Sequence, residues 1–281
     1  MSSLIQPYIA MSSLKYYKQL VNANGISHFY AFTKDNVNHQ NALAVPDGCI
    51  DILFSDSNDQ PSAHIYGSVL EPTLVFNNDT NHYFGVRFYP GGGYSFKDIE
   101  IKELINNMFD FTELLKSTDL LEKISTSSTF EEKIKHFNNH YQQHLIKQNT
   151  TFDPMTLKQF MLNNILTTNG QIRVSELAAA TGYSERYVNK KFIDYFGIRP
   201  KVFCKIIRYQ HVLNQLKDIH NLENNHKLID IAHDAGYYDQ AHMYKDFNEF
   251  SAHSPGQYIQ LLKQSDYANK LILVNKSLIL K

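Results

Sequence analysis

The pattern of hydrophobic and polar positions divides the chain into two contrasting stretches. In residues 26–88, apolar and β-branched residues gather in runs of four to six that alternate with turn-forming residues, as is typical of strands. From about residue 94 the apolar positions recur every three or four residues, as on one side of a helix. The sequence therefore predicts a β-rich first part and a helical second part.

Six strands are expected in the first part, separated by turns such as Pro46-Asp47-Gly48. They are Ser27–Phe32, Ala42–Val45, Ile50–Phe54, His64–Ser68, Thr73–Phe76 and Tyr83–Phe88. Short strands at this spacing favour an antiparallel barrel or sandwich, and small barrels of this kind can hold one small ligand. The sequence does not identify such a ligand, so the effector-binding residues stay unassigned.

Two helical patterns follow between residues 94 and 147. The first is carried by Ile101, Leu104, Ile105 and Met108. The second, over residues 130–146, has one narrow apolar stripe of Phe130, Ile134, Phe137, Tyr141 and Leu145. Two interpretations are open: these helices pack against the β-rich part, or they form a subunit interface. Residues 147–152 are polar and precede Asp153-Pro154, which indicates a linker and a helix start.

The stretch from Val174 to Phe203 predicts a helix-turn-helix. Val174–Thr181 forms the first helix, and Gly182 supplies the left-handed turn that glycine tolerates. Ser184 caps the second helix, which ends near Phe196 before Gly197. The second helix of such a unit enters the DNA major groove.

The second helix has an inward and an outward side. Val188, Phe192 and Tyr195 are expected to face inward. Arg186, Asn189 and Lys190 then share the outward face. Arg and Lys donate to guanine and Asn pairs with adenine, so these residue types suit base edges. The remaining DNA contacts of this unit, mostly to phosphates, are expected from Ser184, Lys191, Arg199 and Lys201.

The same pattern recurs 54 residues further along the chain and indicates a second unit. Val174, Leu177, Ala178 and Gly182 correspond to Leu228, Ile231, Ala232 and Gly236. After one inserted residue, Val188, Lys190, Phe192, Pro200 and Phe203 correspond to Met243, Lys245, Phe247, Pro255 and Tyr258. Residues 201–217 between the units form one helix of about 25 Å. Such a spacer could set both second helices in successive major-groove segments on one DNA face.

The second unit carries a longer motif. It reads Ile229-Asp-Ile-Ala-His-Asp-Ala-Gly236-Tyr-Tyr-Asp239-Gln240, followed by Met243, Lys245, Phe247 and Ser254-Pro255-Gly-Gln-Tyr258. With these residues, the region from about 155 to 263 resembles the AraC/XylS family of bacterial transcription regulators. The resemblance implies a seven-helix DNA-binding domain that binds promoters sequence-specifically.

Carried over by position, the resemblance implies that Arg186, Asn189 and Lys190 read bases in the first unit. The DNA contacts of the second unit are expected from Tyr238, Gln240, Ala241, His242 and Lys245. Lys190 and Lys245 stand where the family usually has arginine, which removes the bidentate fork. Ala252 stands where a capping glycine is usual, so the second recognition helix is expected to end less sharply.

Two motifs in the first part are similar to sensor-type domains attached to some members of this family. They are Pro46-Asp-Gly-Cys-Ile-Asp-Ile-Leu-Phe54 and Gly85-Val-Arg-Phe-Tyr-Pro-Gly-Gly92. This resemblance implies a cupin-like effector or regulatory domain and names no ligand.

Charge distinguishes the two parts more than the net charge of −1 suggests. Residues 1–149 carry a net charge of −5 and residues 150–281 carry +4. Residues 172–217 hold nine basic and three acidic side chains, as expected of a phosphate-binding surface. Residues 218–260 hold two lysines and seven acidic side chains. We therefore predict that the first unit dominates DNA affinity, while the second adjusts specificity or contacts polymerase.

Motifs for other function classes are missing from the sequence. There is no phosphate loop, nucleophile elbow or Cys-His pairing. The histidines of the first part, His28, His39, His64 and His82, lack the paired spacing of a metal site. Cys49 and Cys204, far apart in sequence, indicate a reducing compartment without a disulfide framework. No apolar run approaches the roughly 18 residues of a membrane span. We expect a cytoplasmic protein that uses no cofactor or metal and is not an enzyme.

Together these features predict a transcription regulator that binds double-stranded promoter DNA through two tandem helix-turn-helix units. We expect that it recruits RNA polymerase as an activator, and a small-molecule effector and a homodimer are compatible with the sequence. The operator, the effector, the sign of regulation and the oligomeric state stay open at this point. Two alternatives remain. The β-rich barrel could serve only as a dimerisation scaffold, or it could be a metal or enzyme domain to which DNA binding is secondary.

Three regions are expected. Residues 1–150 form the regulatory or dimerisation domain, β-rich to about residue 93 and helical over 94–147. Residues 151–265 form the DNA-binding domain. Residues 266–281 form an apolar tail that docks back onto either domain or takes part in association.

Overall fold

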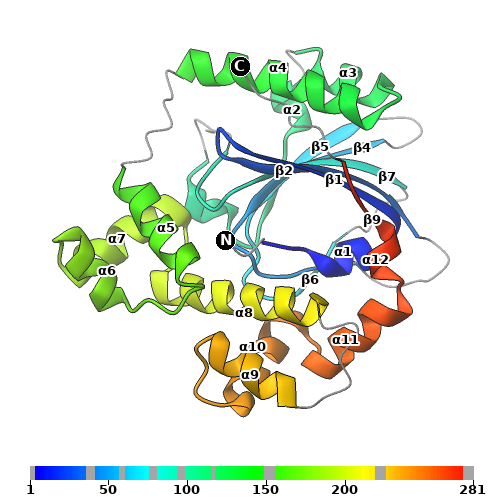
Figure 1. Ribbon diagram of the computed structural model, residues 1–281. Coiled ribbons are helices and arrows are strands. Elements are labelled where there is room, and N and C mark those ends of the chain that lie inside the picture. The colour runs from blue at the N-terminus through cyan, green and yellow to red at the C-terminus, as the bar shows by residue number, and fades with distance from the viewer. Residues whose placement is uncertain are drawn as a thin grey trace.

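The computed structural model describes residues 4–35, 42–56, 61–75, 81–93, 99–115, 118–148, 156–218 and 226–274. A seven-stranded sheet forms the centre of the molecule (Figure 1). Helices cover one of its faces, and a two-stranded sheet, a short N-terminal helix and the C-terminal helices lie on the other. The predicted order, a β-rich part followed by a helical part, is confirmed.

The large sheet has the strand order β8-β5-β4-β7-β2-β1-β9. Its strands are β1 (Ser13–Ala23), β2 (Ile26–Lys34), β4 (Ile50–Asp56), β5 (Ser62–Tyr66), β7 (His82–Phe88), β8 (Met108–Asp110) and β9 (Leu271–Leu273). β3 (Leu43–Ala44) and β6 (Thr73–Leu74) form the small sheet. All pairs are antiparallel except β1 with β9. Since β8 and β9 do not pair with each other in the described residues, the large sheet is open and is not a closed barrel.

All six predicted strands overlap observed ones, and β1, β8 and β9 were not predicted. The helical prediction for residues 101–108 was wrong beyond Leu104. A 3₁₀ turn, η1 (Ile101–Leu104), is followed by Asn106 in the left-handed conformation (φ 58°) and then by β8. Strand pairing of β8 with β5 overrides the helical periodicity of this short segment.

Helices α2 (Thr112–Leu115), α3 (Leu120–Thr126) and α4 (Phe130–Gln148) cover one face of the sheet. On α4, Ile134, Phe137 and Tyr141 are at most 1% exposed. The ring of Phe137 lies 5.8 Å from that of Phe29 on β2. The apolar stripe therefore packs against the sheet, and the first of the two interpretations is confirmed.

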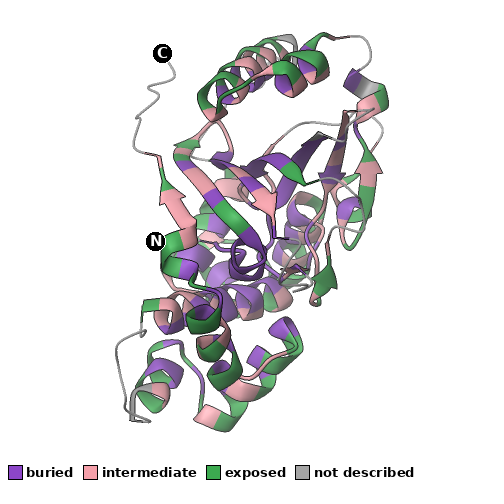
Figure 2. Cartoon of the chain, turned by 90° about the vertical axis from the view of Figure 1, so that its right-hand side faces the viewer, coloured by how far each residue is buried: buried purple, intermediate pink, exposed green. Residues whose placement is uncertain are grey.

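The opposite face of the sheet joins the C-terminal helices in one core. Side chains alternate along each strand, so Asp51, Leu53 and Ser55 of β4 face away from α4. Tyr30 and Phe32 of β2 belong to the same buried cluster as residues of the C-terminal helices. Between them lies α1 (Pro7–Met11), which is buried throughout. Figure 2 shows the buried residues concentrated where the sheet meets these helices.

Seven helices make up residues 157–264 of the described chain, the number that the family resemblance implied. They are α5 (Leu157–Thr167), α6 (Val174–Thr181), α7 (Glu185–Phe196), α8 (Pro200–Asp218), α9 (His226–Asp234), α10 (Gln240–Ser251) and α11 (Pro255–Gln264). The two helix-turn-helix units, α6–α7 and α9–α10, both pack on the spacer helix α8. The predicted linker overlaps the end of α4, and the rest of it, with Asp153-Pro154, lies outside the described residues.

Each end of the chain packs against the other part of the molecule. Near the N-terminus, the ring of Tyr8 on α1 stacks on His253, 5.3 Å away, beside α11. Near the C-terminus, α12 (Tyr267–Lys270) leads into β9, which pairs in parallel with β1. Lys270 Nζ donates to the Met11 carbonyl oxygen at 2.8 Å. The described part of the tail, residues 266–274, thus docks on the N-terminal sheet, which is one of the two roles expected of the tail.

Candidate DNA-binding surface and ligand cavity

Helix α7 is fixed at both ends by the residues that the sequence singled out. Ser184 Oγ accepts a hydrogen bond from the Tyr187 backbone N–H at 3.3 Å. Gly197 ends the helix in the left-handed conformation (φ 71°). Val188 and Phe192 are fully buried as predicted, whereas Tyr195 is half-buried and the adjacent Phe196 fills the core. The hydroxyl of Ser184 is therefore engaged in capping.

The opposite face of α7 presents cationic side chains to solvent. Arg186 and Lys190 are exposed, as are Arg199 and Lys201 at the start of α8. No ion pair recorded between described residues involves any of the four. Asn189 is half-buried, and its Nδ2 donates to the Glu185 carbonyl oxygen at 2.8 Å. Arg186 and Lys190 are thus the open cationic groups of this face.

Lys191 is the expected phosphate contact with the most protein partners. Its Nζ lies 3.5 Å from an Asp194 carboxylate oxygen. It also lies 6.0 Å and 5.9 Å from the ring centres of Tyr187 and Tyr195. Because Asp194 offsets its charge, Lys191 offers less attraction to a phosphate than Arg199 or Lys201.

An exposed aromatic pair beside this face was not predicted. Tyr183 and Tyr187 are 49% and 38% exposed, and their ring centres are 4.6 Å apart. They flank the capped start of α7, and aromatic side chains at such a position can contact thymine methyl groups. The signal in the sequence was their spacing of four residues around Ser184.

The second unit has the same helix arrangement as the first, but its recognition helix has a different N-cap residue. Asp239 Oδ1 accepts from the His242 backbone N–H at 2.7 Å and so starts α10. Ala241, His242 and Lys245 are exposed, Gln240 is half-buried, and Tyr238 is 88% exposed. Lys245 is the only Lys or Arg of α10, so this face has one permanent positive charge.

Several acidic side chains of the second unit bind other parts of the protein. Lys205 Nζ on α8 contacts Asp246 Oδ1 at 3.1 Å and Glu249 Oε2 at 2.9 Å. Asp234 accepts from His211, also on α8, and this bond lowers the pKa of the carboxyl group. Part of the negative charge counted in this unit is therefore offset within the protein, and Glu223 lies outside the described residues.

Ala252 ends α10 in the left-handed conformation (φ 56°), with its N–H donating to the Asn248 carbonyl oxygen at 3.0 Å. The expectation of a less sharp helix end was wrong, because Ala252 adopts the left-handed conformation that glycine usually provides.

This conformation costs an alanine about 1 kcal/mol, so Ala252→Gly should stabilise the protein by that amount. Thermal unfolding checks this, with Gly182→Ala as the opposite change, because a Cβ added at Gly182 (φ 71°) meets no atom within 4 Å. A melting temperature lowered by Ala252→Gly would contradict the strain.

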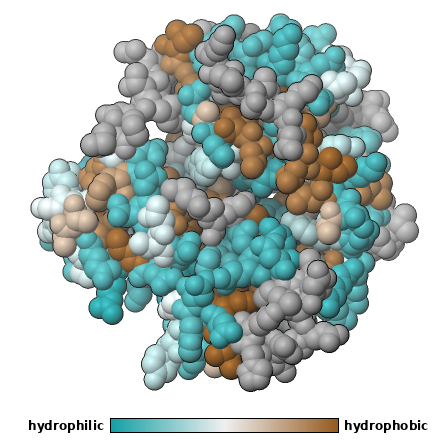
Figure 3. Space-filling view, viewed as in Figure 1, coloured by the Kyte–Doolittle hydropathy of each residue, from teal (hydrophilic) through white to brown (hydrophobic). Residues whose placement is uncertain are grey.

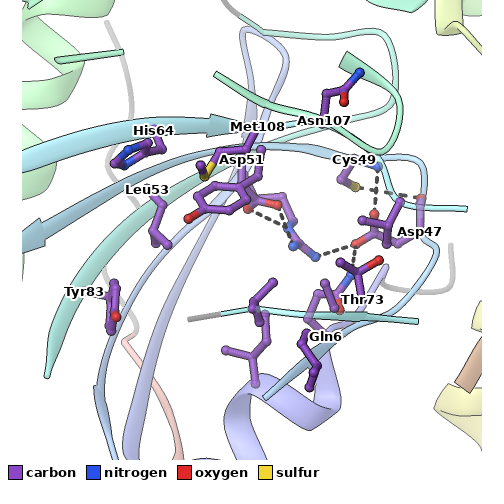
Figure 4. A pocket seen from close by; sticks show the side chains of 18 of the residues that line it. Gln6, Asp47, Cys49, Asp51, Leu53, His64, Thr73, Tyr83, Asn107 and Met108 are labelled. Carbon is purple, nitrogen blue, oxygen red and sulfur yellow. Dashed lines mark hydrogen bonds and ion pairs between the residues drawn. The ribbon is translucent and has the colours of Figure 1, made fainter. Parts of the chain in front are cut away.

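A cavity of about 420 Å³ lies on the inner face of the large sheet (Figure 4). Its walls come from the sheet strands, from β3 and β6, from Gln6 and Ile9 at α1, and from Asn106 to Met108. Three charged side chains, Asp47, Asp51 and Arg87, also line it. Its size is in the range of small-molecule sites.

These three side chains form a buried row. Arg87 Nε and Nη2 donate to the two Asp51 oxygens at 2.9 and 2.7 Å, and Nη1 donates to Asp47 Oδ2 at 2.6 Å. Burial opposes the charge on Arg87, but the two carboxylates raise its pKa well above the usual value. Burial raises the pKa of Asp47, with Arg87 acting in the opposite direction. We call Asp47, Arg87 and Asp51 the charged row.

The charged row connects to α8 through the N-terminal segment. Gln6 Nε2 donates to Asp47 Oδ2 at 2.8 Å. The neighbouring Ile5 N–H donates to Gln210 Oε1 at 2.8 Å, and Gln210 Nε2 donates to the Pro46 carbonyl oxygen at 2.9 Å. Gln210 is fully buried on α8. The cavity and the spacer of the two units therefore share one hydrogen-bonded region, which the sequence did not reveal.

The residues considered for other chemistry are dispersed or inert. His28, His64 and His82 lie on different strands, and His39 lies outside the described residues. The described residues contain no group of three or more side chains that could hold a metal ion. Cys49 and Cys204 are buried free thiols, and burial raises the pKa of Cys49, which disfavours the thiolate. Within the described helices, none combines the length and apolarity of a membrane span.

Comparison with known families assigns the two parts. Residues 177–260, which contain both recognition helices, match a helix-turn-helix domain. The C-terminal part is an AraC-type helix-turn-helix domain, and the chain is a DNA-binding transcription regulator. Residues 23–110 of the regulator, which hold the charged row, match a domain of unknown function (DUF6597). DNA is thus a partner of this protein.

Solved structures similar to the regulator include ToxT from Vibrio cholerae O395, with 14% identity and a TM-score of 0.42, covering 88% of this chain and 96% of that one. Another is ToxT from Vibrio cholerae strain SCE256 bound to an unsaturated fatty acid, with 14% identity and a TM-score of 0.43, covering 90% and 95%. No curated protein sequence matches the regulator.

Proposed function

We propose that the regulator reads promoter DNA with the outward faces of α7 and α10. Base contacts come from Arg186, Asn189 and Lys190 in the first unit and from Gln240, Ala241, His242 and Lys245 in the second. Ser184, Lys191, Arg199, Lys201 and Tyr238 contact the sugar-phosphate backbone. The observation that carries this proposal is the exposure of Arg186 and Lys190 opposite the buried Val188 and Phe192. Figure 3 shows a largely hydrophilic surface over α8, between the units.

The first unit supplies most of the affinity. Arg186, Lys190, Arg199 and Lys201 are exposed cations there, whereas α10 offers Lys245 alone. Neutralising phosphates releases counterions and dominates affinity for DNA. The acidic residues held by Lys205 repel DNA less than their number suggests, so this ranking rests on exposed cations and not on net charge.

Selection of bound DNA from a random library supplies the operator for testing this ranking. Arg186→Ala is expected to weaken binding to that operator by about tenfold or more, and Lys245→Ala by less. Fluorescence anisotropy at one salt concentration measures both. Lys135→Ala, which removes an exposed charge on α4, is the matched control and should leave the affinity unchanged.

The ranking fails if Lys245→Ala weakens binding more than Arg186→Ala. The wider proposal fails if neither variant differs from Lys135→Ala.

The same proposal extends to regulation. The N-terminal part senses a small-molecule effector in the cavity and alters the seating of α8. The size of the cavity and the contacts from Asp47 through Gln6 and Ile5 to Gln210 support this role. From the family resemblance, the proposal also holds that the regulator contacts RNA polymerase, activates transcription and forms a homodimer. It further includes a cytoplasmic location and domain limits at residues 150 and 265.

A further inference from the structure

The lining of the cavity carries one uncompensated negative charge. It includes two carboxylates, Asp47 and Asp51, and one guanidinium, Arg87, and no lysine or second arginine of the described chain joins them. Lys18 is not among the lining residues, although burial lowers its pKa only to about 8 and it therefore keeps its positive charge at pH 7. A net charge in a buried site is costly, so the lining favours a ligand that brings a positive charge.

The hydrogen bonds of the charged row oppose an anionic ligand. Arg87 donates through Nε, Nη1 and Nη2 to carboxylates that are already in place. An incoming carboxylate would compete with Asp47 and Asp51 for one guanidinium and would leave three negative charges beside one positive charge. An ammonium group would instead balance the row and bond directly to a carboxylate.

Asp51 is the most exposed of the three side chains of the charged row that line the cavity. Its side chain is 13% exposed, against 5% for Arg87 and 4% for Asp47. Figure 4 shows Asp51 near the middle of the lining, with Leu53, His64 and Tyr83 toward one side and Asp47, Thr73 and Gln6 toward the other. The open edge of this carboxylate is therefore the polar anchor of the cavity.

The remaining walls suit the apolar body of such a ligand. Tyr30, Tyr66 and Tyr83 line the cavity together with the aliphatic side chains of Ile9, Leu53, Val69, Leu74 and Val75. Aromatic faces attract cations, and aliphatic walls bury hydrocarbon. Met108, which is 55% exposed, lies at the rim.

We propose that the cavity binds a small organic cation, a protonated amine on an apolar body, with the ammonium group on Asp51. The amine rests against the tyrosines, and its hydrocarbon faces Leu53 and Ile9. Ile9 belongs to α1, and Gln6 precedes it, so the occupant touches the segment that holds Gln210. The regulatory consequence rests on the proposed function, whereas binding of the cation does not.

The test uses two matched sets of probes on the full chain. One set is hexylamine, hexanol and hexanoate, and the other is 2-phenylethylamine, 2-phenylethanol and 3-phenylpropanoate. Within each set the shape is nearly constant and the charge changes. Calorimetric titration at pH 7 should show at least one amine binding about tenfold or more tighter than its alcohol and its carboxylate.

Three variants separate the charge from the shape of the cavity. Asp51→Asn should remove the preference for the amine. Asp119→Asn, at the exposed residue that precedes α3, removes an equal charge elsewhere and should retain the preference. Tyr66→Leu, at a half-buried position, should weaken the amine more than the alcohol. It keeps the test decisive if Asp51→Asn does not fold.

The proposal is overturned if a carboxylate or an alcohol binds as tightly as its amine, or if neither amine binds at millimolar concentration. Operator affinity is measured on the same preparations without probe. Failure of the amines with normal DNA binding would refute only the ligand class, and loss of the Arg186→Ala effect would refute the proposed DNA contacts.

Discussion

Replacing Arg87 by methionine is expected to destabilise the folded protein by about 3–5 kcal/mol at pH 7. Arg87 is 4% exposed, and its three donor nitrogens bond to Asp47 and Asp51. Removing it leaves two carboxylates buried side by side without a cation. Chemical denaturation measured on the purified full chain gives the free energy of unfolding.

The loss of stability in Arg87→Met should be larger at high pH than at low pH. Burial already raises the pKa of Asp47, and Arg87 opposes that rise. Without Arg87 the Asp47 carboxyl group titrates higher in the folded state than in the unfolded state, where its pKa is about 4. The folded variant then binds more protons than its unfolded chain. Its free energy of unfolding therefore falls as the pH rises above about 4 and recovers as the pH returns toward 4.

A neutral version of the row is the control for this prediction. Arg87→Met combined with Asp47→Asn and Asp51→Asn removes all three buried charges, and we expect it to regain most of the lost stability at pH 7. If Arg87→Met alone matches the wild-type stability at pH 7, or if its loss does not change with pH, the buried charges are not what stabilises this face of the sheet.

The C-terminal half could be predicted from the sequence because its determinants are local. Ser184 and Gly197 bound α7 as capping rules require. The 54-residue repeat located Gly236, which adopts the same left-handed conformation (φ 74°) as Gly182 (φ 71°). Helix ends and buried stripes follow from residues within one or two turns, so these predictions needed no tertiary information.

The errors in the N-terminal half have a common physical cause. β8 and β9 each have three residues, and they are strands because they pair with β5 and β1, which are distant in sequence. β1 mixes polar and apolar residues and showed no clear alternation. Pairing partners decide such segments, whereas periodicity decides long amphipathic helices such as α4.

The charged row was visible in the sequence as an anomaly whose meaning required the register of the sheet. Asp51 and Arg87 interrupt otherwise apolar strands, and β4 pairs with β7 so that these two residues are directly opposite. Asp47 lies four residues before Asp51, in the turn that contains Gly48. A charged residue in each of two apolar runs indicates a buried pair, but only the pairing identifies the partners.

Removal of residues 267–281 is expected to lower the free energy of unfolding by about 2–5 kcal/mol, the range for deleting a large buried side chain. Tyr267 is 6% exposed in the core that joins the sheet to the C-terminal helices, and Leu271 packs against that core. The deletion also removes β9 from β1 and the Lys270 bond to Met11. Calorimetry of the truncated and full chains measures the change.

Two further variants distinguish strand pairing from simple loss of apolar surface. The Val274 N–H donates to the Lys18 carbonyl oxygen at 2.9 Å, so Val274→Pro removes this bond and keeps Tyr267 and Leu271. Amide exchange should then rise in Tyr16–Lys18 of β1 ahead of the rest of the sheet. Leu273→Ala, at a side chain 58% exposed, is the control and should change neither measurement.

Unchanged exchange in β1 and an unchanged melting temperature after truncation would mean that the tail does not hold the two parts together. With both effects present, the seating of the second helix-turn-helix unit depends on a strand contributed to the regulatory sheet.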